Sequence, residues 1–188
     1  MLIRHSIVYV AARLLAGALS LLTTALLTWA LSPAEYGVYG LALVVMSFAS
    51  NIGFDWLALA FSRFGQATQN RSKAVTAIVC IFAALVAVTG VIALMVAGVS
   101  APSHIVGPVL IGMILAWTLA WFELAGRFAI MCFRPLTYLS MNVVRAVGIL
   151  ALAVGAAALT RDPLLTAAAT AFGMILGALL ARFPGEKI

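Results

Sequence analysis

The sequence predicts an all-α polytopic membrane protein, a bundle of six transmembrane helices. The chain has 188 residues, of which 65% are hydrophobic and 9% are charged, and its mean hydropathy is +1.20. A soluble domain carries about 25% charged residues, so a soluble fold of this length would leave much apolar surface in water. Six stretches also approach the roughly 20 apolar residues that cross a bilayer, with polar breaks between them.

The predicted helices follow one another with short connections. They cover residues 6–31, 33–62, 74–99, 104–123, 136–159 and 164–181. Because short loops join neighbouring helices, we expect sequential helices to pack antiparallel, and residues 1–188 to form a single bundle. The segment AGRFAIMCFRPL, residues 125–136, has two interpretations: an amphipathic stretch along the inner leaflet, or the ends of the flanking helices.

The first apolar stretch has some features of a signal peptide. Arg4 precedes it, but Arg13 interrupts it and the apolar run continues to Leu31, which is long for the apolar core of a signal peptide. We therefore expect an uncleaved first helix, with cleavage as the alternative.

The basic residues predict orientation and not nucleic-acid binding. The net charge is +6, yet the 11 Lys and Arg are scattered and several lie inside apolar runs. Cytoplasmic loops of membrane proteins collect Lys and Arg, so their distribution indicates which side is the cytoplasm. In this topology one side of the membrane has only Arg161. The other side collects eight basic residues, which are Arg4, Arg63, Arg71, Lys73, Arg127, Arg134, Arg182 and Lys187. We expect both termini in the cytoplasm, and the membrane to be the bacterial cytoplasmic membrane.

The stretch LSPAEYG at residues 31–37 predicts a tight helical hairpin. Ser32 is a favourable N-cap, Pro33 suits the first helical position, and Glu35 completes a capping box. Gly37 and Gly40 would allow close contact between the two helices.

Residues 26–64, LLTWALSPAEYGVYGLALVVMSFASNIGFDWLALAFSRF, resemble the opening of bacterial polysaccharide and oligosaccharide flippases. These belong to the superfamily that also holds the multidrug and toxin extruders. Gly53 matches a glycine near the inner end of the family's second helix, and RFAIMCFRPLTYLSMNVVRAVG resembles its link into the fifth helix. Such flippases have twelve to fourteen helices in two lobes, so the resemblance implies the N-terminal six-helix lobe alone. It also implies a lipid-linked saccharide as substrate and a second lobe or another copy as partner.

Charged and amide side chains inside the predicted helices are the candidate substrate-binding residues. An Arg at a helix centre costs about 2.5–3.5 kcal/mol on insertion scales, so its presence favours a functional role. Arg145 lies roughly 14 Å into the fifth helix at 1.5 Å per residue, and Asn142 shares its face. We expect this face to line a cavity for a pyrophosphate or an acidic sugar, unless Arg145 reaches the interface instead.

Three further residues extend the set. Arg13 either faces the cavity or extends to the cytoplasmic headgroups. Asn51 and Asp55, four residues apart, form a polar stripe. Asp55 is the candidate for a coupling ion, with pairing to Arg13 or an interfacial position as alternatives, and the family more often has a small or neutral residue there.

Small and aromatic residues suggest two kinds of helix surface. Gly173 and Gly177 in the last helix, with Gly148 and Gly155 in the fifth, predict close-packing faces for another helix of the bundle or for a partner lobe. Tryptophans near helix ends predict an interfacial belt, with stacking on sugars as the alternative; they are Trp29, Trp56, Trp117 and Trp121.

We expect a membrane transporter, or its N-terminal half, that translocates lipid-linked oligosaccharide or polysaccharide precursors by alternating access. The alternatives are an accessory or truncated subunit without transport activity alone, and a lobe of a multidrug-type exporter. An enzyme is not expected, because the five acidic residues and two His are spread over both sides and form no catalytic motif. No cofactor or metal is expected, and Cys80 and Cys132 are interpreted as ordinary apolar residues.

Overall fold

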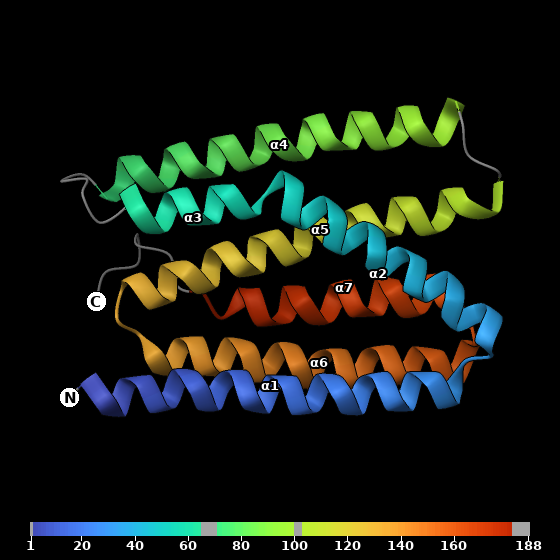
Figure 1. Ribbon diagram of the computed structural model, residues 1–188, viewed down its shortest axis with the longest axis horizontal. Helices are drawn as coiled ribbons and strands as arrows, with labels where there is room; N and C mark the ends of the chain where they lie inside the picture. Colours follow the sequence, from blue (N-terminus) through green and yellow to red (C-terminus); the bar gives the residue numbers. More distant parts are fainter. Residues whose placement is uncertain (1, 65–70, 100–102, 182–188) are drawn as a thin grey trace.

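The computed structural model describes residues 2–64, 71–99 and 103–181, which form a bundle of helices lying side by side (Figure 1). The helical segments are α1 (Leu2–Ala30), α2 (Pro33–Gly53), α3 (Asp55–Phe64), α4 (Arg71–Val99), α5 (Ser103–Met131), α6 (Pro135–Thr160) and α7 (Pro163–Leu179). No β-strand occurs in these ranges, so the predicted all-α fold class is confirmed. The start of α1 and the end of α7 lie at the same end of the bundle (Figure 1).

Five segments are long and apolar enough to cross a membrane. They are Val8–Ala30, Pro33–Arg63, Val75–Gly98, Ile105–Met131 and Pro135–Thr160. The sixth predicted helix corresponds to α7, which is apolar but has only 17 residues. Its length is about 26 Å at 1.5 Å per residue, against a hydrocarbon core of about 30 Å.

The second predicted helix is not continuous, because a break at Phe54 divides it into α2 and α3. Phe54 has φ −127° and ψ −24°, outside the helical range. Its carbonyl accepts from the Leu57 N–H, only three residues on, at 2.9 Å. The Phe54 ring is buried and contacts the Phe82 ring on α4 at a centroid distance of 5.3 Å. Gly53, the weakest helix former in this stretch, directly precedes the break, and the helix axis changes direction between α2 and α3 (Figure 1).

The other large difference lies after residue 123, where the fourth helix was predicted to end. The helix instead continues to Met131 as the end of α5, followed by a turn in which Phe133 adopts a positive φ of 52°. The structure therefore agrees with the second interpretation of residues 125–136, the ends of the flanking helices. The remaining boundaries fall within about one helical turn of their predicted positions.

Two of the helices that start at the opposite end of the bundle, α2 and α7, have side-chain caps. The Ser32 hydroxyl accepts from the Glu35 N–H at 3.3 Å, while the Glu35 carboxylate accepts from the Ser32 N–H at 2.8 Å. Asp162 caps α7 by accepting from the Leu164 N–H at 2.8 Å. The capping box predicted from LSPAEYG is confirmed.

The packing of sequential helices expected from the short loops holds for α6 and α7 but not for α1 and α2. α1 packs against α6, and α2 packs against α5, while α1 and α2 diverge after their shared turn and touch sparsely (Figure 1). The prediction of close contact through Gly37 and Gly40 is wrong, because nothing from a neighbouring element lies within 4 Å of a Cβ built at either position. Gly112 of α5 makes the close approach instead: its Cβ would lie 2.8 Å from the Ala42 carbonyl oxygen of α2.

α6 and α7 form the most extensive helix pair, and glycines bring their backbones together. A Cβ added at Gly173 would lie 2.7 Å from the Ile149 backbone nitrogen, and one at Gly177 would lie 2.8 Å from the Met141 carbonyl oxygen. Gly148 faces Gly173 across the same contact. These three glycines therefore serve packing within the bundle, whereas Gly155 faces open space.

This difference predicts opposite effects of the same substitution. Gly155→Ala should raise the thermal unfolding temperature in detergent, because alanine favours a helix over glycine by about 1 kcal/mol. Gly173→Ala should lower it, since the new methyl group collides with backbone and not with a flexible side chain. Equal shifts for the two variants would contradict the close contact between α6 and α7.

Candidate functional site

The divergence of α1 from α2 leaves a cavity between them of about 270 Å³. α1 and α2 supply most of its walls, and α5, α6 and α7 close it from behind. Its lining residues are Ala16, Ser20, Thr23, Thr24, Leu27, Tyr36, Tyr39, Leu43, Met46, Leu119, Arg145, Ala146, Ile149, Thr170 and Met174. Among these, Arg145 is the one charged residue, and no carboxylate lines this cavity.

Hydroxyl groups supply the rest of the cavity's polarity. They come from three elements and belong to Ser20, Thr23, Thr24, Tyr36, Tyr39 and Thr170. The Tyr39 and Thr170 hydroxyls lie 3.3 Å apart and link α2 to α7. The threonine hydroxyls donate to carbonyls one turn earlier, as Thr170 does to Thr166 at 2.9 Å and Thr23 to Leu19 at 2.8 Å. Each hydroxyl oxygen that donates in this way keeps acceptor capacity and can turn to donate to a ligand.

Arg145 is held in place by the α6–α7 contact. A Cβ at Gly177 would lie 2.7 Å from the Arg145 Cβ, so only glycine at 177 lets the arginine backbone sit this deep against α7. The guanidinium carbon lies 4.3 Å from the centroid of the Phe122 ring on α5. Stacking on an aromatic ring fixes the plane of the guanidinium while leaving its N–H groups available for hydrogen bonds.

The Arg145 guanidinium has an unused donor. Its Nε atom is buried and has no hydrogen-bond partner among the residues that the structure describes. A buried charged donor without a partner costs free energy, which an anionic ligand would recover. Glu123 on α5 acts electrostatically on Arg145 and on Arg13, so its carboxylate offsets part of the positive charge.

The structure separates the other predicted site residues from this cavity. Asn142 is buried, but its amide donates to the Tyr138 carbonyl at 2.9 Å, which satisfies that group within α6. Arg13 is exposed, and its Nε donates weakly to the Tyr138 hydroxyl at 3.5 Å. Neither residue lines the cavity, although Ala16, one turn after Arg13, does.

Asn51 and Asp55 lie elsewhere. Both are exposed, at the end of α2 and the start of α3 respectively, with the break at Phe54 between them. α1 and α3 lie on opposite sides of the bundle, so the alternative pairing of Asp55 with Arg13 is not made (Figure 1). In the described ranges, no three His, Cys, Asp or Glu side chains come close enough to hold a metal ion.

Sequence reasoning missed the hydroxyl lining. Ser20, Thr23 and Thr24 lie at adjacent and one-turn spacings on α1, and a cluster of hydroxyls in an apolar helix is a signal that could have been used. Tyr39 and Thr170 are 131 residues apart in the chain, and no local pattern joins them.

Taken together, the cavity suits a ligand with a negatively charged group and several hydroxyls. Arg145 can donate to oxygen atoms of a phosphate or carboxylate, and the surrounding Ser, Thr and Tyr hydroxyls can exchange hydrogen bonds with sugar hydroxyls. The absence of an acid from its lining makes an organic cation a poor ligand.

Comparisons with protein-family models, curated proteins and solved structures find no match for this chain. The assignment of function therefore depends on the geometry of the site and on the resemblance described above.

The charge of Arg145 predicts how a thiol placed in the cavity reacts. In a background with Cys80→Ala and Cys132→Ala, Ser20→Cys should react about tenfold faster with an anionic than with a cationic methanethiosulfonate, relative to free cysteine. Adding Arg145→Gln should bring the two rates together. A charge preference that survives Arg145→Gln would show that this guanidinium does not set the potential of the cavity.

Proposed function

We propose that this chain is a membrane transporter lobe that translocates a lipid-linked oligosaccharide or polysaccharide precursor. The observation that carries the proposal is Arg145, whose buried Nε lies beside a hydroxyl-lined cavity and has no partner in the described part of the chain. A lipid-linked saccharide has matching parts: an anionic phosphate or pyrophosphate for the guanidinium, and sugar hydroxyls for the Ser, Thr and Tyr side chains.

A membrane location is supported by the outer surface of the bundle. Large apolar side chains are widely exposed on it, including Leu21 at 74%, Trp29 at 92% and Leu94 at 64% of their areas. Exposed apolar patches of this extent mark a surface that faces lipid or a partner and not water. The membrane we propose is the bacterial cytoplasmic membrane, with both chain termini on the cytoplasmic side as the basic residues indicate.

The divergence of α1 and α2 supports alternating access. The cavity lies between two helices that are joined by the capped turn at Ser32 and touch sparsely elsewhere, so a ligand can enter between them without breaking contacts between α1 and α2. In the proposed mechanism the saccharide head enters between α1 and α2, and the polyprenyl tail stays in the lipid. A second lobe, from another chain or another copy, completes the cavity and rocks against this one.

Two alternatives remain as proposals. An accessory subunit would leave transport to its partner, and the divergence of α1 from α2 would then be a docking surface. A multidrug-type exporter lobe is the weaker alternative, since the cavity lining offers a cation no carboxylate.

Complementation tests the transport proposal. The chain would be expressed, alone and with a second six-helix lobe, in a strain that lacks its own polysaccharide flippase. We expect restored surface polysaccharide, reduced about tenfold or more by Arg145→Ala and preserved by Arg63→Ala, an exposed arginine outside the cavity.

Two results would count against the proposal. If Arg145→Ala supported full polysaccharide export at equal protein levels, the cavity would have no role in transport. If surface polysaccharide were restored only with the partner lobe present, and substitutions of this chain's cavity residues had no effect, the accessory-subunit alternative would replace the transport proposal.

A further inference from the structure

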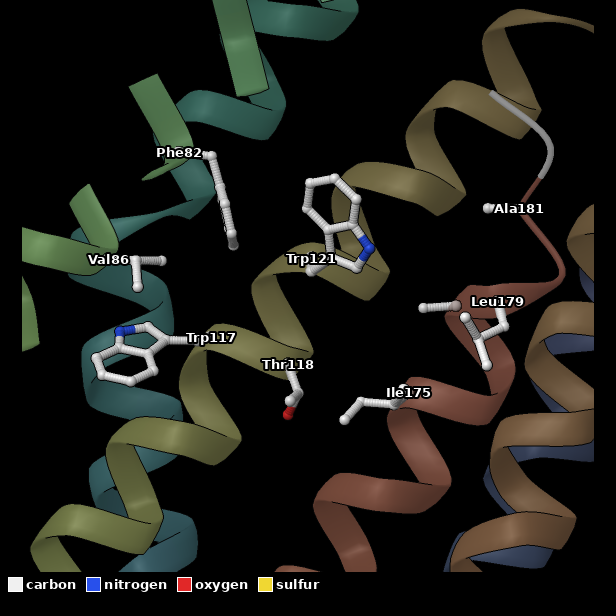
Figure 2. Close-up of a pocket in the computed structure, with 9 residues that line it drawn as sticks. Phe82, Val86, Trp117, Thr118, Trp121, Ile175, Leu179 and Ala181 are labelled. Atoms are coloured by element: carbon white, nitrogen blue, oxygen red, sulfur yellow. The ribbon is translucent and has the colours of Figure 1, made fainter. Parts of the chain in front are cut away.

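A second hollow lies on the opposite side of α5 from the first and is not used by the proposed function. It has a volume of about 440 Å³. α4 and α7 each pack against α5 but not appreciably against each other, so a furrow runs over α5 between them. Figure 2 shows Phe82 and Val86 on one wall, Ile175 and Leu179 on the other, and Trp121 and Thr118 between them.

The furrow is elongated along the helix axes. Each of the three helices contributes a pair of residues four apart, and such pairs lie one above the other on one face of a helix. The pairs are Phe82 and Val86, Trp117 and Trp121, and Ile175 and Leu179. We call the hollow that these six residues line the aromatic groove.

The aromatic groove offers a ligand almost no polar contact. The Trp117 Nε1 donates to the Thr89 hydroxyl at 3.0 Å, and so is already satisfied. The Thr118 hydroxyl donates to the Leu115 carbonyl at 2.9 Å and lies 3.6 Å from the Met174 sulfur. A lining of this kind favours an apolar ligand, because it offers a polar ligand few hydrogen bonds.

The aromatic groove is too small to enclose two turns of a partner helix. A helix is about 10 Å across, so two turns would displace roughly twice 440 Å³. A single hydrocarbon chain is narrow enough to lie along the furrow, in the direction that lipid chains run in a bilayer.

The charge of one end of the bundle indicates which lipid. The aromatic groove runs to Leu179, at the end where α7 stops short and where α5 ends. Arg63, Lys73, Arg127 and Arg134 lie on helix ends or turns at this same end. Basic side chains near the membrane surface attract anionic headgroups.

We infer that the aromatic groove is a binding site for an acyl chain of an anionic membrane phospholipid. The site needs the bundle to be embedded in a membrane but does not depend on the saccharide cavity or on transport. It would hold α4, the most exposed long helix, against α5 and α7.

Tryptophan fluorescence tests this inference directly. Replacing the exposed Trp29 and Trp56 by Phe leaves Trp117 and Trp121, which line the groove, as the only tryptophans. The full chain in detergent would be titrated with phosphatidylglycerol carrying brominated acyl chains, which quench indoles at contact. We expect saturable quenching near equimolar lipid, with brominated phosphatidylcholine needing about tenfold more.

Groove-filling variants supply the control. Ile175→Phe should abolish the saturable phase, whereas Ile114→Phe, at a similarly exposed isoleucine outside the groove, should keep it. Val86→Phe on the opposite wall should repeat the effect of Ile175→Phe, and circular dichroism would show that each variant is folded.

Three outcomes would overturn the inference. Gradual quenching that is equal for both lipids and all variants would indicate simple partitioning into micelles. Displacement of the bound lipid by equimolar polyprenyl phosphate, with phosphatidylglycerol unable to compete back, would make the groove a site for the substrate tail. Quenching unchanged by both Ile175→Phe and Val86→Phe would place the lipid elsewhere.

Discussion

The backbone contact between α6 and α7 is the constraint on which the rest of the arrangement depends. Gly173 and Gly177 let α7 approach so closely that any side chain there would collide with α6 backbone atoms or with Arg145. With α7 in this position, α6 packs on its other side against α1, and α7 also contacts α5. The Arg145 Cβ thereby lies against Gly177, and its guanidinium stacks on the Phe122 ring.

The two hollows follow from how the other helices share α5. Gly112 allows α2 to pack closely against α5, and α2 thereby diverges from α1. The space between α1 and α2 is the polar cavity. On the other side, α4 and α7 lean on α5 without meeting, and the space left there becomes the aromatic groove. The polar cavity is lined with hydroxyls around the Arg145 guanidinium and suits a polar, anionic ligand. The aromatic groove is lined with apolar side chains and suits a hydrocarbon chain.

Features encoded by neighbouring residues were predictable from the sequence. Long apolar runs predicted the helices and SPAE predicted the cap of α2, because each depends on contacts within a few residues. The break at Phe54 and the extension of α5 to Met131 depend on packing against other helices, as the Phe54–Phe82 contact shows. Arg145 stood out because a buried charge is costly wherever it occurs. The hydroxyl groups around it come from three other helices, α1, α2 and α7, whose proximity no local pattern encodes. Asn142 is on the same face by spacing, but its side-chain amide donates to the Tyr138 carbonyl of its own helix.

The central claim is that Arg145 binds an anionic group of a ligand in the cavity between α1 and α2. Thermal unfolding in the presence of inorganic pyrophosphate tests this claim most directly. A ligand that binds only the folded state stabilises it by about 2.7 kcal/mol at a hundred times its dissociation constant. The account predicts a saturable rise in the unfolding temperature of the wild-type chain, lost in Arg145→Gln and retained in Arg63→Gln. The same rise in all three proteins would mean that pyrophosphate acts through ionic strength or surface charge, and would contradict the account.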